Sequence, residues 1–219
     1  MKFKIILLLF CAFVVSGTSL IASEKMLSLS EIMDKVEKKY DVPDFSAYFI
    51  QESTLKAMDI SDVASGSILV KRPGMMRWEY DKPDRQTITT DGTTLWVYKP
   101  DDNQVMIGKA PSFFGDGKGA GFLSDVKLIR EKFKVNFEKD KSDHDYVLKL
   151  LPKKQTVGIT KIYLAISKIT FKIKKIITLN EYDDENVIEL INSQFNLNLD
   201  KSLFSFIVPK GTDVIMMDE

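Results

Sequence analysis

The sequence has little of the chemistry that most enzymes and metal sites need. It contains one cysteine, Cys11, and one histidine, His144, among 219 residues. Common zinc sites combine several Cys and His side chains, and a Cys–His nucleophile needs both residue types in the working protein. His144 lies in the polar stretch KSDHDY, which is typical of a solvated turn. We therefore expect no metal site, no cofactor and no catalytic residue.

An excess of basic residues is also lacking. The 31 Lys and Arg residues balance 31 Asp and Glu residues, so the formal net charge is zero. A nucleic-acid-binding protein needs a cationic surface, and nucleic acid is therefore excluded as an expected partner. Hydrophobic residues make up 44% of the chain, which is typical of a globular domain with a buried core.

The N-terminus has the order of a secretory signal peptide. Lys2 and Lys4 precede an apolar run from Ile5 to Val15, and small and polar residues follow. An uncleaved membrane anchor is the alternative, but the run is shorter than the roughly 20 apolar residues of a membrane-spanning helix. We expect residues 1–23 to be removed, with cleavage between Ser19 and Ser23. Cys11 would leave with this peptide, so the mature protein would have no disulfide.

One helix is predicted at the start of the mature chain. Ser28 and Glu31 have the spacing of a capping box, in which each side chain accepts a hydrogen bond from an unpaired amide of the first turn. An apolar stripe at helical spacing follows, and Pro43 ends the helix after about twelve residues. The stripe consists of Leu29, Ile32, Met33, Val36 and Tyr40.

From Phe45 onward the apolar period changes to two, which is typical of strands. Turn clusters separate the alternating stretches at the spacing of antiparallel hairpins. These clusters are Arg72–Gly74, Asp91–Gly92, Pro100–Asn103 and Asp183–Asn186. The pattern predicts a mainly β fold with some α, in which eight or more strands curl into a barrel or a wrapped sheet. Periodicity alone leaves open whether its interior is filled or binds a ligand.

Residues 110–125, APSFFGDGKGAGFLSD, interrupt this alternation. The segment combines four glycines with three phenylalanines and shows no clear period. We interpret it as a lid segment over the barrel. Its phenylalanines could equally belong to the main core.

Four stretches resemble the LolA family of periplasmic carriers, which escort lipoproteins to the outer membrane. They are FSAYFIQE, KRPGMMRWEYDKP, TDGTTLWVYKPDDNQV and the tail NVIELINSQFNLNLDKSLFSFIVPKGTDVI. The resemblance implies an incomplete antiparallel β-barrel that encloses an apolar cavity for acyl chains and is covered by helices and a lid. Residues 24–219 would then form one carrier domain in the periplasm.

The same resemblance implies roles for particular residues. Arg72 matches the family arginine that is thought to hold the lid closed over the empty cavity and to couple opening to cargo loading; the alternative is a plain surface arginine. The expected cavity residues are Phe49, Met76, Trp78, Tyr80 and Trp96, although packing roles are the alternative for this strand face. The expected lid residues are Phe113, Phe114, Phe122 and Leu123.

The resemblance also implies partners. They are acylated lipoproteins, an inner-membrane ABC-type complex that releases them, and an outer-membrane acceptor lipoprotein where one exists. We expect a monomer without enzymatic activity. A carrier of another lipid or glycolipid, or an envelope-stress sensor with a similar barrel, is the alternative function; a sensor would be expected to carry a transmembrane or second domain.

Overall fold

The computed structural model describes residues 27–110, 121–138, 142–154 and 158–217. These residues form a single twelve-stranded sheet in the order β12-β6-β5-β4-β3-β2-β1-β11-β10-β9-β8-β7. The strands are β1 (Asp44–Leu55), β2 (Ile60–Lys71), β3 (Met75–Lys82), β4 (Gln86–Thr90), β5 (Thr94–Lys99), β6 (Gln104–Lys109), β7 (Phe133–Glu138), β8 (Asp145–Pro152), β9 (Lys161–Ser167), β10 (Ile173–Leu179), β11 (Glu185–Phe195) and β12 (Asp213–Met216).

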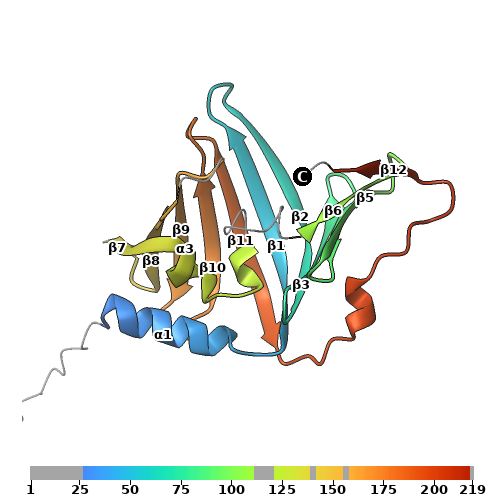
Figure 1. Ribbon diagram of the computed structural model, residues 1–219. Coiled ribbons are helices and arrows are strands. Elements are labelled where there is room, and N and C mark those ends of the chain that lie inside the picture. The colour runs from blue at the N-terminus through green and yellow to red at the C-terminus, as the bar shows by residue number, and fades with distance from the viewer. Residues whose placement is uncertain (1–26, 111–120, 139–141, 155–157, 218–219) are drawn as a thin grey trace, which may run out of the picture.

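The sheet curves strongly but does not close, since β7 and β12 lie at its two ends (Figure 1). Neighbouring strands are antiparallel, except that β12 pairs with β6 in parallel. The helical elements are α1 (Leu29–Tyr40), η2 (Gly121–Leu123), α3 (Leu128–Lys132) and η3 (Lys201–Phe204). The predicted incomplete β-barrel with helical cover is confirmed.

Helix α1 has the predicted start and length. Ser28 is the N-cap, and its side chain and that of Glu31 form the capping box. The helix buries Ile32, Met33, Val36 and Tyr40 against the sheet. In Figure 1 it lies across the lower end of the sheet, opposite the tip of the long β1–β2 hairpin.

Three of the four predicted turns lie between the strands as expected. Arg72–Gly74 lies between β2 and β3, Asp91–Gly92 between β4 and β5, and Pro100–Asn103 between β5 and β6. The prediction for Asp183–Asn186 was wrong by two residues, because Glu185 and Asn186 already belong to β11. Both pair with β1, and this pairing extends the strand through a polar stretch of sequence.

The sheet has an inner face and an outer face, because successive side chains of each strand point to opposite sides. The inner face carries the main core, to which every strand from β7 to β11 and from β1 to β3 contributes. Helix α1, η2 and α3 cover this face (Figure 1). No helix among the described residues has the length and apolar character needed to span a bilayer.

The C-terminal chain lies against the outer face of the other half of the sheet. The Arg77 Nη1 atom donates a hydrogen bond to the Leu203 carbonyl over 3.1 Å, and the rings of Tyr98 and Phe206 lie 5.1 Å apart. Asp44 anchors the start of this segment, since its carboxylate accepts hydrogen bonds from the Leu197 and Leu199 amides over 2.6 and 2.9 Å. The C-terminal segment therefore covers the outer face at β3 and β5.

Candidate functional site

Four of the five predicted cavity residues lie on the inner face. Phe49 projects from β1, whereas Met76, Trp78 and Tyr80 alternate along β3. The Phe49 ring lies 4.9 Å from the ring of Trp78 and 4.9 Å from that of Tyr80, both in edge-to-face geometry. Phe49, Met76 and Trp78 are buried in the main core, and Tyr80 packs against it half-buried. These residues form one wall of the inner face, in which Phe49, Trp78 and Tyr80 supply the aromatic rings.

Trp96 is the exception, and its predicted cavity position is wrong. It lies opposite Thr89 on β4, which in turn lies opposite Arg77 on β3. Direct partners in an antiparallel sheet share a face, so Trp96 is on the outer face with Arg77. Its neighbours Leu95 and Val97 are the residues of β5 that point inward and are buried. The alternation was correctly predicted, but Trp96 was placed on the wrong face.

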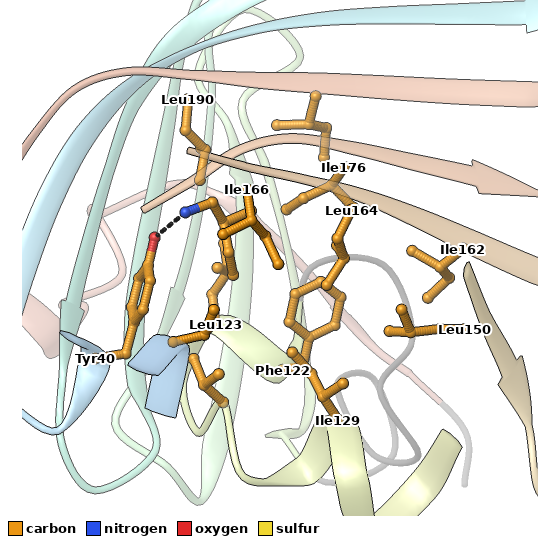
Figure 2. Close-up of a cluster of buried hydrophobic side chains, with 14 of the residues drawn as sticks. Tyr40, Phe122, Leu123, Ile129, Leu150, Ile162, Leu164, Ile166, Ile176 and Leu190 are labelled. Atoms are coloured by element: carbon orange, nitrogen blue, oxygen red, sulfur yellow. Dashed lines mark hydrogen bonds between the residues drawn. The ribbon is translucent and has the colours of Figure 1, made fainter. Parts of the chain in front are cut away.

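Two of the four predicted lid residues are described by the structure. Phe122 and Leu123 form η2 and are fully buried. Figure 2 shows them, with Ile129 from α3, facing Leu150, Ile162 and the other apolar side chains of β8–β10. Phe113 and Phe114 lie outside the described residues. The end of the lid segment thus lies over the inner face, where its side chains occupy part of the apolar core.

A hydrogen bond fixes α1 beside this core. The backbone amide of Ile173 donates to the Tyr40 hydroxyl over 3.0 Å, as the dashed line in Figure 2 shows. The Tyr40 ring also packs edge-to-face against Phe45 and Phe195. Burial raises the pKa of the Tyr40 phenol well above its ordinary value, although the bond from Ile173 offsets part of this effect. Tyr40 is therefore a neutral anchor for the helical cover.

Arg72 lies where the first helix, the β2–β3 turn and the lid segment meet. Its amide donates to the carbonyl of Pro43, three residues after the end of α1, over 2.8 Å. Its Nη1 atom lies 3.8 Å from the Asp125 Oδ1 atom, and Asp125 is the last residue of the lid segment. The Arg72 side chain is 20% exposed. The sequence prediction named Arg72 but missed Asp125, although a carboxylate at the end of the lid segment was visible in the sequence.

The guanidinium of Arg72 is only partly satisfied. Its Nε and Nη2 atoms are buried and have no hydrogen-bond partner in the part of the chain that the structure describes. Burial lowers the pKa of Arg72, and the carboxylates of Asp125 and Asp41 offset part of this effect. Arginine still remains charged at any physiological pH. The site therefore holds, against the end of the lid segment, a cation with two donor atoms that have no partner among the described residues.

Comparison with known proteins identifies the family. The family model described as outer membrane lipoprotein carrier protein LolA matches residues 41–207. The outer-membrane lipoprotein carrier protein of Neisseria meningitidis serogroup B is 30% identical over 178 residues, covering 80% of this chain and 82% of that protein. The protein of the same name from Pseudomonas paraeruginosa is 28% identical over 214 residues, covering 97% and 99%.

A solved structure supports the fold on its own. An uncharacterized conserved protein from Thermus thermophilus matches with a TM-score of 0.54 at 16% sequence identity, covering 87% of this chain and 100% of that one. At this identity the likeness concerns the fold alone. The match to the family model and the sequence relatives together show that the chain belongs to the LolA family of outer-membrane lipoprotein carriers.

Proposed function

We propose that the protein is a periplasmic chaperone that binds the acyl chains of lipoproteins released from the inner membrane and carries them to the outer membrane. The observation that carries this proposal is the inner face of the open sheet, where Phe49, Met76 and Trp78 form an apolar wall under helical cover. This arrangement occurs in a chain of a lipoprotein carrier family. The proposed cargo is therefore an acylated polypeptide.

The energetics of acyl chains explain why such a face is useful. Burial of each acyl methylene group in a membrane or an apolar site is favourable by about 0.8 kcal/mol. An acylated protein therefore stays in its membrane unless a carrier offers its chains another apolar surface. In the proposed bound state, the acyl chains replace the lid side chains Phe122 and Leu123 on the inner face. Exchange of one apolar contact for another keeps the net binding energy moderate, which a carrier that must release its cargo requires.

The proposed partners and site roles follow from this function. An ABC-type complex of the inner membrane would supply the lipoprotein, and an outer-membrane acceptor lipoprotein, where one exists, would receive it. Arg72 would hold the lid segment closed through Asp125 when no cargo is bound, since these two side chains form an ion pair. The protein would act as a monomer and without catalysis.

The two tryptophans provide an internal test, because Trp78 lies on the inner face and Trp96 on the outer face. We expect an acylated peptide with brominated acyl chains to quench the fluorescence of Trp78 strongly in a Trp96→Phe variant. Trp96 in a Trp78→Phe variant should keep its fluorescence with the same ligand. Steady-state fluorescence titration measures both.

The control ligand is the same peptide with unbrominated chains, and circular dichroism verifies that both variants are folded. Equal quenching of the two tryptophans, or quenching of Trp96 alone, would contradict an acyl-binding inner face.

A further inference from the structure

On three strands the inner face changes from apolar to polar toward the β1–β2 hairpin tip, and the change is staggered from β3 to β1 to β11. Going toward the β1–β2 hairpin tip, each strand carries buried apolar residues and then half-buried polar ones. This order is Phe45, Ala47, Phe49, Gln51 and Ser53 on β1, Leu190, Ile188 and Asn186 on β11, and Met76, Trp78 and Tyr80 on β3. Such a gradient matches an amphiphile whose acyl chains lie on the apolar part and whose head group lies nearer the tip.

The polar residues are connected by hydrogen bonds into one group, which we call the polar ladder (Tyr80, Gln51, Ser53 and Asn186). The Tyr80 hydroxyl donates to the Gln51 Oε1 atom over 2.9 Å. The Gln51 Nε2 atom donates to the Asn186 Oδ1 atom over 2.8 Å, and the Ser53 hydroxyl donates to the same oxygen over 3.0 Å. The ladder thus joins β3, β1 and β11.

The ladder passes over β2, and small residues make this possible. On the inner face of β2, Gly66 lies opposite Phe49 and Tyr80, and Ala64 lies opposite Gln51. A Cβ atom on Gly66 would lie 1.8 Å from the Glu79 carbonyl oxygen, so only glycine fits there. No side chain larger than a methyl group therefore stands between Tyr80 and Gln51.

The free hydrogen-bonding capacity of the ladder has a definite chemistry. The Asn186 Oδ1 atom accepts two hydrogen bonds of the ladder. The Asn186 Nδ2 group has no protein partner within the described chain. That group offers two N–H donors. Burial raises the pKa of Tyr80 to about 12, so the phenol stays neutral. A neutral ladder with free N–H donors suits carbonyl oxygens better than phosphate, which is usually bound by cations.

We propose that the polar ladder binds the neutral carbonyl groups that join the acyl chains of the cargo to its head group, with the Asn186 amide as the donor. This inference rests on the proposed lipoprotein-carrier function and adds an orientation to it. The acyl chains extend from the ladder toward Phe49 and Phe45, and the polypeptide leaves past the β1–β2 hairpin tip.

The test compares two synthetic peptides that carry two saturated chains of equal length, attached through esters in one and through ethers in the other. Ethers keep the apolar chains but lack the carbonyl acceptors. We expect the wild type to bind the ester peptide about fivefold more tightly than the ether peptide, because one additional hydrogen bond contributes about that factor. Tryptophan fluorescence titration of the wild type measures both dissociation constants.

The matched variant is Asn186→Asp, which keeps the acceptor for Gln51 and Ser53 but loses both N–H donors. This variant should bind the ester peptide as weakly as it binds the ether peptide. Its affinity for the ether peptide should equal that of the wild type. A wild type without ester preference would overturn the ladder proposal and leave the carrier function standing, and this comparison does not depend on the folding of any variant. An ester preference that survives in Asn186→Asp would also overturn it. Binding of neither peptide would overturn the carrier function together with the ladder.

Discussion

An Arg72→Leu variant is expected to load acylated cargo like the wild type and to fail to transfer it to an acceptor. In the proposed mechanism, loading depends on the apolar inner face, which this substitution leaves intact. Transfer would depend on closure of the lid segment behind the leaving cargo, and Arg72 is the cation that lies against Asp125 at the end of that segment. The measurement is a two-step assay, in which cargo bound to the carrier and cargo on the acceptor are quantified separately.

A second substitution separates the ion pair from the rest of the guanidinium. The Arg72–Asp125 pair is partly exposed and its atoms are 3.8 Å apart, so it contributes about 1 kcal/mol at most, or about fivefold in transfer. We therefore expect Asp125→Asn to slow transfer only by that factor. The larger loss in Arg72→Leu would come from the buried Nε and Nη2 atoms, which have no partner in the described chain and which would bind new acceptors in the proposed lid movement.

The matched control is Arg85→Leu, which removes an arginine from an exposed ion pair with Asp101. It should leave loading and transfer unchanged. Normal transfer by Arg72→Leu would remove Arg72 from the mechanism.

An Asp44→Ala variant is expected to lower the free energy of unfolding by about 4 kcal/mol. The Asp44 carboxylate is buried, accepts hydrogen bonds from Leu197 and Leu199, and lies 3.5 Å from the Lys71 ammonium. Its removal would leave Lys71, which is 14% exposed, without its counter-ion, and would release the start of the C-terminal segment. Urea unfolding measures the change. The control Asp101→Ala, in an exposed pair, should cost less than about 1 kcal/mol.

The same residue makes stability depend on pH. Burial alone would raise the pKa of Asp44, but the amides of Leu199 and Leu197 and the Lys71 ammonium outweigh it and hold the pKa below its ordinary value. A carboxyl with a lowered folded-state pKa stabilises the protein above its unfolded-state pKa, and this contribution is lost as pH falls through the folded-state pKa. The difference in unfolding free energy between wild type and Asp44→Ala should therefore shrink in acid. If the difference in unfolding free energy stayed constant as pH fell below the ordinary pKa of an aspartate, the lowered pKa of Asp44 would be contradicted.

Local signals predicted much of the fold. The capping box at Ser28 and the stripe through Tyr40 defined α1, because helix caps and helical periodicity depend on neighbours in sequence. The turns before β3, β5 and β6 were likewise predicted from Gly, Pro and Asp residues at suitable positions. The family resemblance then supplied the incomplete barrel, which the open twelve-stranded sheet confirms.

Long-range contacts account for what was missed. Leu95 to Tyr98 is apolar on both faces, so alternation could not show which side points inward. The register of β5 with β4 shows that Leu95 and Val97 point inward, and Phe206 of the C-terminal segment packs against Tyr98 on the outer face. The anchoring of that segment by Asp44, and the parallel pairing of β12 with β6, join residues more than a hundred positions apart. No pattern within a short stretch of sequence encodes such partners.

The central claim is that the inner face carries the acyl chains of a lipoprotein. Its most direct test is mass spectrometry of the protein purified from the periplasm of cells that co-express a lipoprotein. We expect an acylated polypeptide to be recovered with the carrier in wild type and in Arg72→Leu. Recovery of free glycolipid alone would favour a carrier of a different lipid, and a protein that binds neither would contradict the claim.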